Sequence, residues 1–227
     1  MLFRQMFDAE SCTYTYLLAA AEGSEALIID PVKGQLAAYL QLIGELGLQL
    51  KIAIDTHVHA DHVTALGALR DATHCVTMMG QPSRAPCVSK AFTDGDVVAV
   101  EGVQLTALFT PGHTDDSYSL LMTDRVFTGD TLLIRGTGRT DFQNGDSRVA
   151  YESLFNRLMK LPDETLVYPG HDYKGWTVST IGEERRFNPR LKVKTADEYA
   201  TLMGSLKLAT PKLMDIAVPA NLRCGLL

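Results

Sequence analysis

Four predicted strands in this chain end directly in a loop that supplies histidine or aspartate side chains. Each strand is a short run rich in apolar and β-branched residues, as expected for a buried strand. We therefore expect the four loops to lie along one edge of the sheets and to form a single site. The strands and their loop residues are 50–54 before Thr56-His57-Val58-His59-Ala60-Asp61-His62, 103–108 before His113, 125–128 before Asp130, and 165–168 before His171.

The first of these loops holds four potential metal ligands within six consecutive residues, namely His57, His59, Asp61 and His62. In an extended stretch His57 and His59 project to the same side, because side chains alternate along a strand. Residues 62–70 have apolar side chains at helical spacing, which places Asp61 and His62 at the loop end and in the first helical turn. The motif indicates one metal centre or two adjacent ones, rather than a polar turn with solvated histidines.

The rest of the pattern predicts an α+β fold, with two mixed sheets packed together and helices outside them. Strands alternate with helices only in part, and hairpins occur as well. We expect one main domain, residues 1–185, and a short C-terminal extension, residues 186–227, packed on it. Further strands are predicted at 14–19, 26–30, 75–79, 97–100 and 117–122, and helices at 36–46, 62–70, 147–160, 176–187 and 196–206.

Charge and hydrophobicity exclude several classes of protein. The formal net charge is −6, and no basic block is present, which argues against a nucleic-acid surface and a polybasic membrane patch. No apolar run approaches the roughly 20 residues that span a bilayer. Asp8 and Glu10 interrupt the N-terminal stretch, so we do not expect a signal peptide. We therefore expect a cytoplasmic protein, or a mature form already processed.

The number and spacing of the cysteines indicate no disulfide framework. Four cysteines with no C-x-x-C pair are too few for a disulfide framework in a chain of 227 residues, so we expect reduced thiols. Cys224 is the one of interest, because the neighbouring Arg223 would lower the pKa of its thiol.

The residues His57-x-His59-x-Asp61-His62, His113, Asp130 and His171 together resemble the metallo-β-lactamase superfamily. The resemblance covers nearly the whole chain. It implies an αββα sandwich with the metal site at the edge between the two sheets.

A narrower resemblance is to the persulfide dioxygenases, carried by residues 134–145, 168–173, 183–185, 188–191 and 218–225. It implies that glutathione persulfide reacts with O₂ and water to give sulfite and glutathione, and that the protein is a homodimer. It also implies one Fe(II) per chain, bound by His57, His113 and Asp130, which is a two-histidine, one-carboxylate set. Thr137 departs from the family pattern, because relatives often have cysteine there.

The same resemblance implies roles for other residues. Arg139 and Arg190 would bind the carboxylates of glutathione, although structural ion pairs are the alternative for both. The hydroxyl of Tyr173 would hydrogen-bond to the persulfide or to oxygen. Four further residues would orient the ligands and hydrogen-bond to bound water: His59, Asp61, His62 and His171. Of these, Asp61, His62 and His171 would also take part in catalysis.

The residues alone also allow a different chemistry. Asp61, His62 and His171 could hold a second metal, with Asp130 bridging and His59 joining the first site. That arrangement suits a two-zinc thiolester hydrolase of the glyoxalase II type, acting on hydroxyacylglutathione. Glyoxalase II usually carries a longer helical C-terminal domain, which favours the dioxygenase. A non-catalytic metal- or thiol-binding module is the third possibility.

Overall fold

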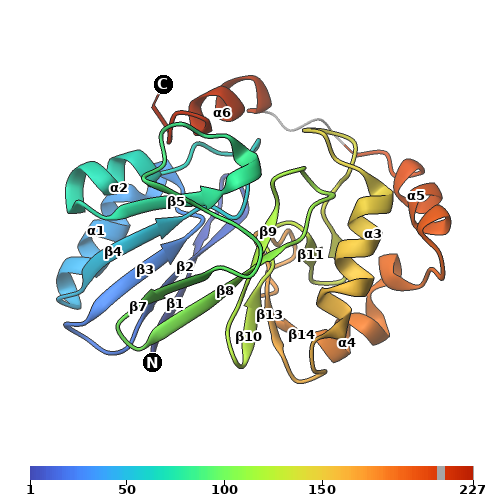
Figure 1. Cartoon of the computed structure of the whole chain (residues 1–227), viewed down its shortest axis with the longest axis horizontal. Coiled ribbons are helices and arrows are strands. Elements are labelled where there is room, and N and C mark those ends of the chain that lie inside the picture. Colours follow the sequence, from blue (N-terminus) through green and yellow to red (C-terminus); the bar gives the residue numbers. More distant parts are fainter. Residues whose placement is uncertain (209–212, 227) are drawn as a thin grey trace. The chain divides into compact units, whose positions relative to one another are not determined.

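The computed structural model describes residues 1–208 and 213–226, which form two compact units (Figure 1). Among the described residues, unit 1 comprises 1–105 with 213–226, and unit 2 comprises 106–208. The domain boundary expected at residue 185 stays a prediction.

Unit 1 is built on a six-stranded sheet with the order β1-β2-β3-β4-β5-β6. The first two pairings are antiparallel, and the pairings from β3 to β6 are parallel. Helices α1 and α2 cover apolar side chains of this sheet, since Tyr39 and Leu69 share one core cluster with Leu17 and Ile28. The elements of this unit are β1 Leu2–Asp8, β2 Thr13–Ala19, β3 Glu25–Ile29, α1 Leu36–Glu45, β4 Gln49–Ile54, α2 Leu66–Thr73, β5 Val76–Gly80, β6 Lys90–Phe92, β7 Val97–Val100 and α6 Met214–Asn221.

A second six-stranded sheet has the order β14-β13-β10-β9-β8-β7, in which β7 and the first residues of β8 are counted with unit 1. Helices α3 and α5 pack on apolar residues of unit 2, where Leu154 and Tyr199 share a core cluster with Val126 and Val167. The elements from β8 onward are β8 Val103–Phe109, β9 Tyr118–Leu121, β10 Arg125–Phe127, β11 Leu132–Leu133, β12 Gly136–Thr137, α3 Ser147–Asn156, β13 Leu166–Tyr168, β14 Ser179–Thr180, α4 Ile181–Phe187 and α5 Ala196–Gly204. Two sheets with flanking helices confirm the predicted mixed α and β class.

Two predicted helices begin later than expected. The helix predicted at 176–187 begins only at Ile181, because Ser179 and Thr180 pair with β13 as β14. The Thr180 hydroxyl then accepts a hydrogen bond from the Glu183 N–H and caps the helix. The helix predicted at 62–70 is α2, which begins at Leu66 and ends at Thr73.

The expectation of four reduced thiols is wrong for two of them, because Cys87 and Cys224 form a disulfide. The two residues are 137 positions apart, and their Cα atoms lie 5.7 Å apart. Local spacing rules do not detect a pair that only the tertiary fold brings together. Cys12 and Cys75 remain free thiols.

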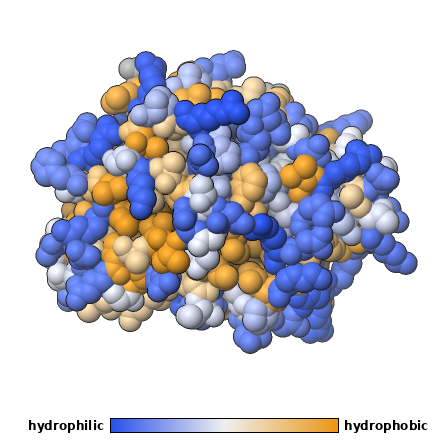
Figure 2. All heavy atoms as spheres, in the orientation of Figure 1, coloured by the Kyte–Doolittle hydropathy of each residue, from blue (hydrophilic) through white to orange (hydrophobic). Residues whose placement is uncertain are grey.

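Figure 2 shows hydrophilic residues over much of the viewed face, with hydrophobic residues gathered over strands of unit 1. Large hydrophobic side chains on those strands include Val97, which is 53% exposed. Within residues 1–208 and 213–226, no helix is long and apolar enough to cross a membrane.

Candidate metal centre

The loop that carries the histidine motif starts from a rigid sheet edge. β3 and β4 are parallel and end level, with Ile29 opposite Ile54. Asp30 and Asp55 therefore leave the sheet side by side, and both are fully buried. The Asp55 N–H donates to the Met78 carbonyl on β5 at 3.2 Å, which extends the same edge. Two buried carboxyl groups thus lie beneath the loop.

Asp30 orients His57 through Thr56. The Thr56 N–H donates to Asp30 Oδ1 at 2.7 Å, and its hydroxyl donates to Oδ2 at 2.9 Å. That hydroxyl has one proton, so its oxygen accepts from Nδ1–H of His57, 3.0 Å away. The remaining lone pair of His57 is then on Nε2, as a metal ligand requires.

His59 is buried and only partly hydrogen-bonded. Its Nε2 atom lies 3.2 Å from Asp30 Oδ1. Its Nδ1 atom is buried without a hydrogen-bond partner among the described residues. A buried nitrogen of this kind suits binding of a metal ion or a water molecule. Burial by itself lowers the pKa of His59, but the carboxylate of Asp30 outweighs it and raises that pKa to about 9.

Asp61 and His62 complete the group in unit 1. His62 Nδ1 lies 2.9 Å from Asp61 Oδ2 and 3.3 Å from the Thr13 hydroxyl. One ligand atom from each of His59, Asp61 and His62 lies within 4.8 Å of the others. The three side chains are therefore arranged to hold a cation or to orient water.

His62 does not lie in a helical turn, contrary to the sequence prediction, whereas Asp61 lies in the loop as expected. The backbone up to Ala65 is irregular, because its polar groups bind elsewhere: the Ala65 N–H donates to Pro31, and the Thr64 N–H donates to Asn221. The Thr64 hydroxyl accepts from the Leu66 N–H at 3.2 Å, at the point where α2 begins.

In unit 2, His113 is delivered by the loop after β8. A Cβ atom on Gly112 would lie 2.3 Å from the Cα of Ala150 in α3, and the φ angle of Gly112 is +130°, so only glycine fits. His113 Nδ1 lies 2.7 Å from the Arg139 carbonyl, which only accepts hydrogen bonds. Nδ1 of His113 therefore carries the proton, and the lone pair is on Nε2.

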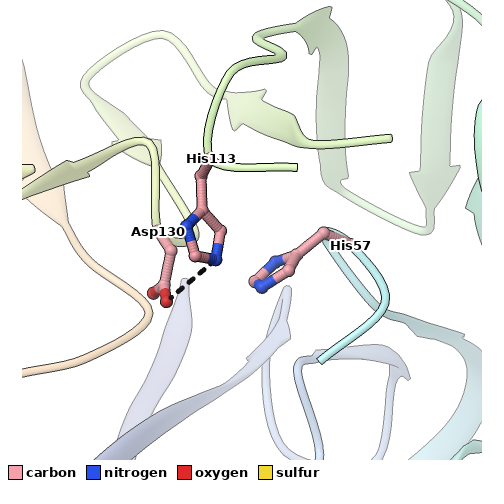
Figure 3. Close-up of side chains that lie close together, drawn as sticks. All are labelled: His57, His113 and Asp130. Atoms are coloured by element: carbon pink, nitrogen blue, oxygen red, sulfur yellow. Dashed lines mark ion pairs between the residues drawn. The ribbon is translucent and has the colours of Figure 1, made fainter. Parts of the chain in front are cut away.

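Asp130 and His171 follow two parallel neighbours, β10 and β13, which end level at Phe127 and Tyr168. His171 Nδ1 lies 2.6 Å from Asp130 Oδ1 and fixes the carboxylate. Asp130 Oδ2 lies 3.6 Å from His113 Nε2, the contact dashed in Figure 3, which is an ion pair only when His113 is protonated. Figure 3 also draws His57, the ligand candidate of unit 1.

Gly138 brings the backbone of residues 136–139 against this group. A Cβ atom there would lie 2.1 Å from the Asp130 carbonyl oxygen and 2.9 Å from the ring of His113. The close approach lets the carbonyl of Arg139 orient His113. The Arg139 guanidinium is engaged elsewhere, because it pairs with Asp141 at 2.7 Å and lies over Phe142. This ion pair holds the pKa of Asp141 below its usual range.

Arg190 has no carboxylate partner among the described residues. It is half-buried and donates to the carbonyl and hydroxyl of Thr137. Burial lowers the pKa of its guanidinium. An unneutralised, half-buried guanidinium is a suitable site for a carboxylate ligand.

Tyr173 lies beside His171, with parallel rings whose centroids are 6.0 Å apart. The side chain is 70% exposed, so its hydroxyl is accessible to solvent.

The sequence comparison assigns this fold and site to a class. Residues 12–171 match the metallo-β-lactamase superfamily. The chain belongs to this superfamily, as its motif indicated.

More similar relatives define a narrower family. The human protein "Persulfide dioxygenase ETHE1, mitochondrial" is 45% identical over 99% of this chain and 89% of its own length. The bovine protein of the same name is 44% identical over 100% and 89%. A crystal structure of ETHE1 from Myxococcus xanthus is 54% identical, with a TM-score of 0.95 over 99% of this chain and 100% of that chain. Within the superfamily, the chain belongs to the persulfide dioxygenases, which are oxidoreductases.

These relatives confirm the predicted family, fold and enzyme class, and they do not support the glyoxalase II-type alternative. Three residues around the motif carried no prediction: Asp30, Asp55 and Asn221. Asp30 is the last residue of the strand predicted at 26–30, and β3 in fact ends at Ile29, so Asp30 follows a strand as the candidate ligands do. Asn221 lies in a segment that carries the resemblance, but nothing in the sequence connects it with the histidine loop.

Proposed function

We propose that this chain oxidises glutathione persulfide at one Fe(II) bound by His57, His113 and Asp130. The observation that carries the proposal is the orientation of these side chains within their own units. Two imidazoles have Nδ1 tied to an oxygen acceptor, and one carboxylate has Oδ1 tied to His171. Each keeps a ligand atom for the metal, namely Nε2, Nε2 and Oδ2.

The donor set fits Fe(II). Two imidazole nitrogens and one carboxylate oxygen form the ligand set of non-haem iron oxygenases, which leave positions open for O₂ and substrate. Iron bound there would supply the electron-transfer chemistry that O₂ needs to react with a closed-shell sulfur compound. In the overall reaction, glutathione persulfide, O₂ and water give glutathione, sulfite and two protons.

The surrounding residues position the ligands and water. His171 holds the Asp130 carboxylate through Oδ1 and so presents Oδ2 to the metal. Asp61, His62 and His59 would orient water for the hydrolytic part of the reaction. The exposed hydroxyl of Tyr173, beside His171, would hydrogen-bond to the persulfide or to oxygen.

Substrate carboxylates would bind to arginine. Arg190 is favoured, because it lacks a described carboxylate partner and remains half-buried. Arg139 would take this role only by exchanging Asp141 for the substrate. We further propose a homodimer, as the resemblance to the persulfide dioxygenases implies, and a cytoplasmic location, because Asp8 and Glu10 interrupt the N-terminal stretch.

The test is oxygen consumption on adding glutathione persulfide to Fe(II)-loaded protein, with metal content determined on the same sample. We expect rapid uptake, sulfite formation and about one iron per chain. Absence of uptake, together with two tightly bound zinc ions and hydrolysis of S-lactoylglutathione, would contradict the proposal.

A further inference from the structure

Asn221, the last residue of α6, is fully buried against the histidine loop of the same unit. Its amide nitrogen donates to the carbonyls of His59 at 2.9 Å and His62 at 2.8 Å. Its amide oxygen accepts from the Thr64 N–H at 2.9 Å. One side chain thus binds three backbone groups of the loop.

Asparagine is matched to this environment. Its amide offers two N–H donors and one oxygen acceptor, and the loop presents two carbonyls and one N–H. These backbone groups are buried in an irregular segment, where no helix or ladder partner satisfies them. An aspartate side chain has the same shape but lacks both N–H donors. An alanine side chain lacks both donors and the acceptor.

Asn221 is itself held firmly. The Gly67 N–H on α2 donates to the Cys224 carbonyl at 2.9 Å, and Lys33 Nζ donates to the Gly225 carbonyl at 2.6 Å. A Cβ atom on Gly225 would lie 2.0 Å from the Thr64 carbonyl oxygen. The disulfide between Cys87 and Cys224 fastens the same turn covalently. The amide therefore acts from a fixed support.

The loop has a different support at each end. Thr56 and Asp30 fix its start at the sheet edge, before His57. Asn221 fixes the part that follows, from His59 to Thr64. His57 lies between these two supports, so the position of its Nε2 depends on both.

We propose that Asn221 is a positioning residue for the metal centre, which presets the backbone of residues 59–64 before the metal binds. This inference rests on the proposed metal site. Losing the amide would let the loop relax, and the metal would then have to order it on binding. Removing groups that orient metal ligands typically costs about 10- to 100-fold in metal affinity.

The test is titration of metal-free protein with Co(II) alone as the probe, followed by its d–d absorption and by competition with a chromophoric chelator. We expect Asn221→Ala and Asn221→Asp to bind Co(II) at least about 10-fold more weakly than the unchanged protein, with an altered spectrum. The matched control is Ile43→Ala, a buried substitution on α1 in the same core cluster as Val218. It should lower the stability to urea while leaving the Co(II) affinity and spectrum unchanged.

Asn221 variants that bind Co(II) as tightly as the unchanged protein, with the same spectrum, would overturn this inference and leave the proposed function untouched. An unchanged protein that binds no Co(II) would overturn the proposed function. If the variants do not fold, hydrogen–deuterium exchange of the unchanged metal-free protein tests whether the loop is ordered before the metal binds. We expect slow exchange at the Thr64 amide, and exchange as fast as in an unprotected loop would overturn the inference.

Discussion

At the scale of single residues, the site depends on atoms that orient the candidate ligands without being ligands themselves. The Arg139 carbonyl sets the proton on His113, and Thr56 sets it on His57. His171 restrains Asp130. Substitutions at these neighbours should therefore weaken metal binding even though every ligand remains.

Gly138→Ala tests this dependence directly. The added Cβ would lie 2.1 Å from the Asp130 carbonyl oxygen and 2.9 Å from the His113 ring, so backbone or ring has to move. We expect the iron content to fall, and stability to fall by about 1–3 kcal/mol because of overpacking. Metal analysis and urea unfolding provide the measurements. The control is Gly44→Ala on α1, where a Cβ meets nothing within 4 Å. An iron content equal to that of the control would contradict the expectation.

Arg190→Ala tests the substrate contact. Losing a charge-assisted hydrogen bond to a carboxylate should raise the KM for glutathione persulfide about tenfold or more, with iron content unchanged. Steady-state oxygen uptake gives the KM. Arg148→Ala is the control, because that side chain is 66% exposed in an ion pair with Asp197. An unchanged KM for Arg190→Ala would remove this arginine from the substrate site.

At the scale of helices and strands, loops become rigid because their flanking elements are well capped and closely packed. Asp146 caps the N-terminus of helix α3, because its carboxylate accepts from the N–H groups of Arg148 and Val149. Its residue Ala150 packs against Gly112, directly before His113. The cap thus contributes to the position of a candidate ligand.

Asp146→Ala should lower the free energy of unfolding by about 0.5–2 kcal/mol, the usual loss for an N-cap residue. Chemical denaturation measures this loss. Asp146→Asn keeps a side-chain oxygen acceptor and should retain most of the stability. Equal losses for both variants would show that the effect does not come from the cap.

The strands were largely predictable because their signal is local. The runs from β2 to β5, and β8, are rich in β-branched and apolar residues, and their predicted ranges overlap the observed ones. β1 and β6 went unrecognised, because β1 alternates poorly and β6 has three residues. Helix α6 also went unrecognised, since Pro219 lies inside it.

At the scale of the whole molecule, long-range pairs were beyond sequence reasoning. The repeated strand-and-loop pattern selected His57, His113, Asp130 and His171, and the iron-binding role of the first three stays a prediction. Nothing local links Cys87 with Cys224, or Asn221 with Thr64, because tertiary packing alone brings each pair together.

Reduction of the disulfide should destabilise the protein. A cross-link that closes a long loop restricts the unfolded chain, so Cys87→Ser should lower the free energy of unfolding by about 2–4 kcal/mol. Urea unfolding with and without reductant measures this. Cys12→Ser, at a free thiol, is the control. Unchanged stability of Cys87→Ser would show that the cross-link contributes nothing in solution.

The support that Asn221 gives to the loop also sets an order of events during synthesis. Asn221 leaves the ribosome 157 residues after Thr64, the backbone group that it binds. Until then a nascent chain displays the histidines on a loop that is fastened only at its start. If Asn221 presets the loop as proposed, selective, tight loading with metal should follow translation of this late segment, and a ribosome-stalled chain that lacks it should compete poorly for the ion.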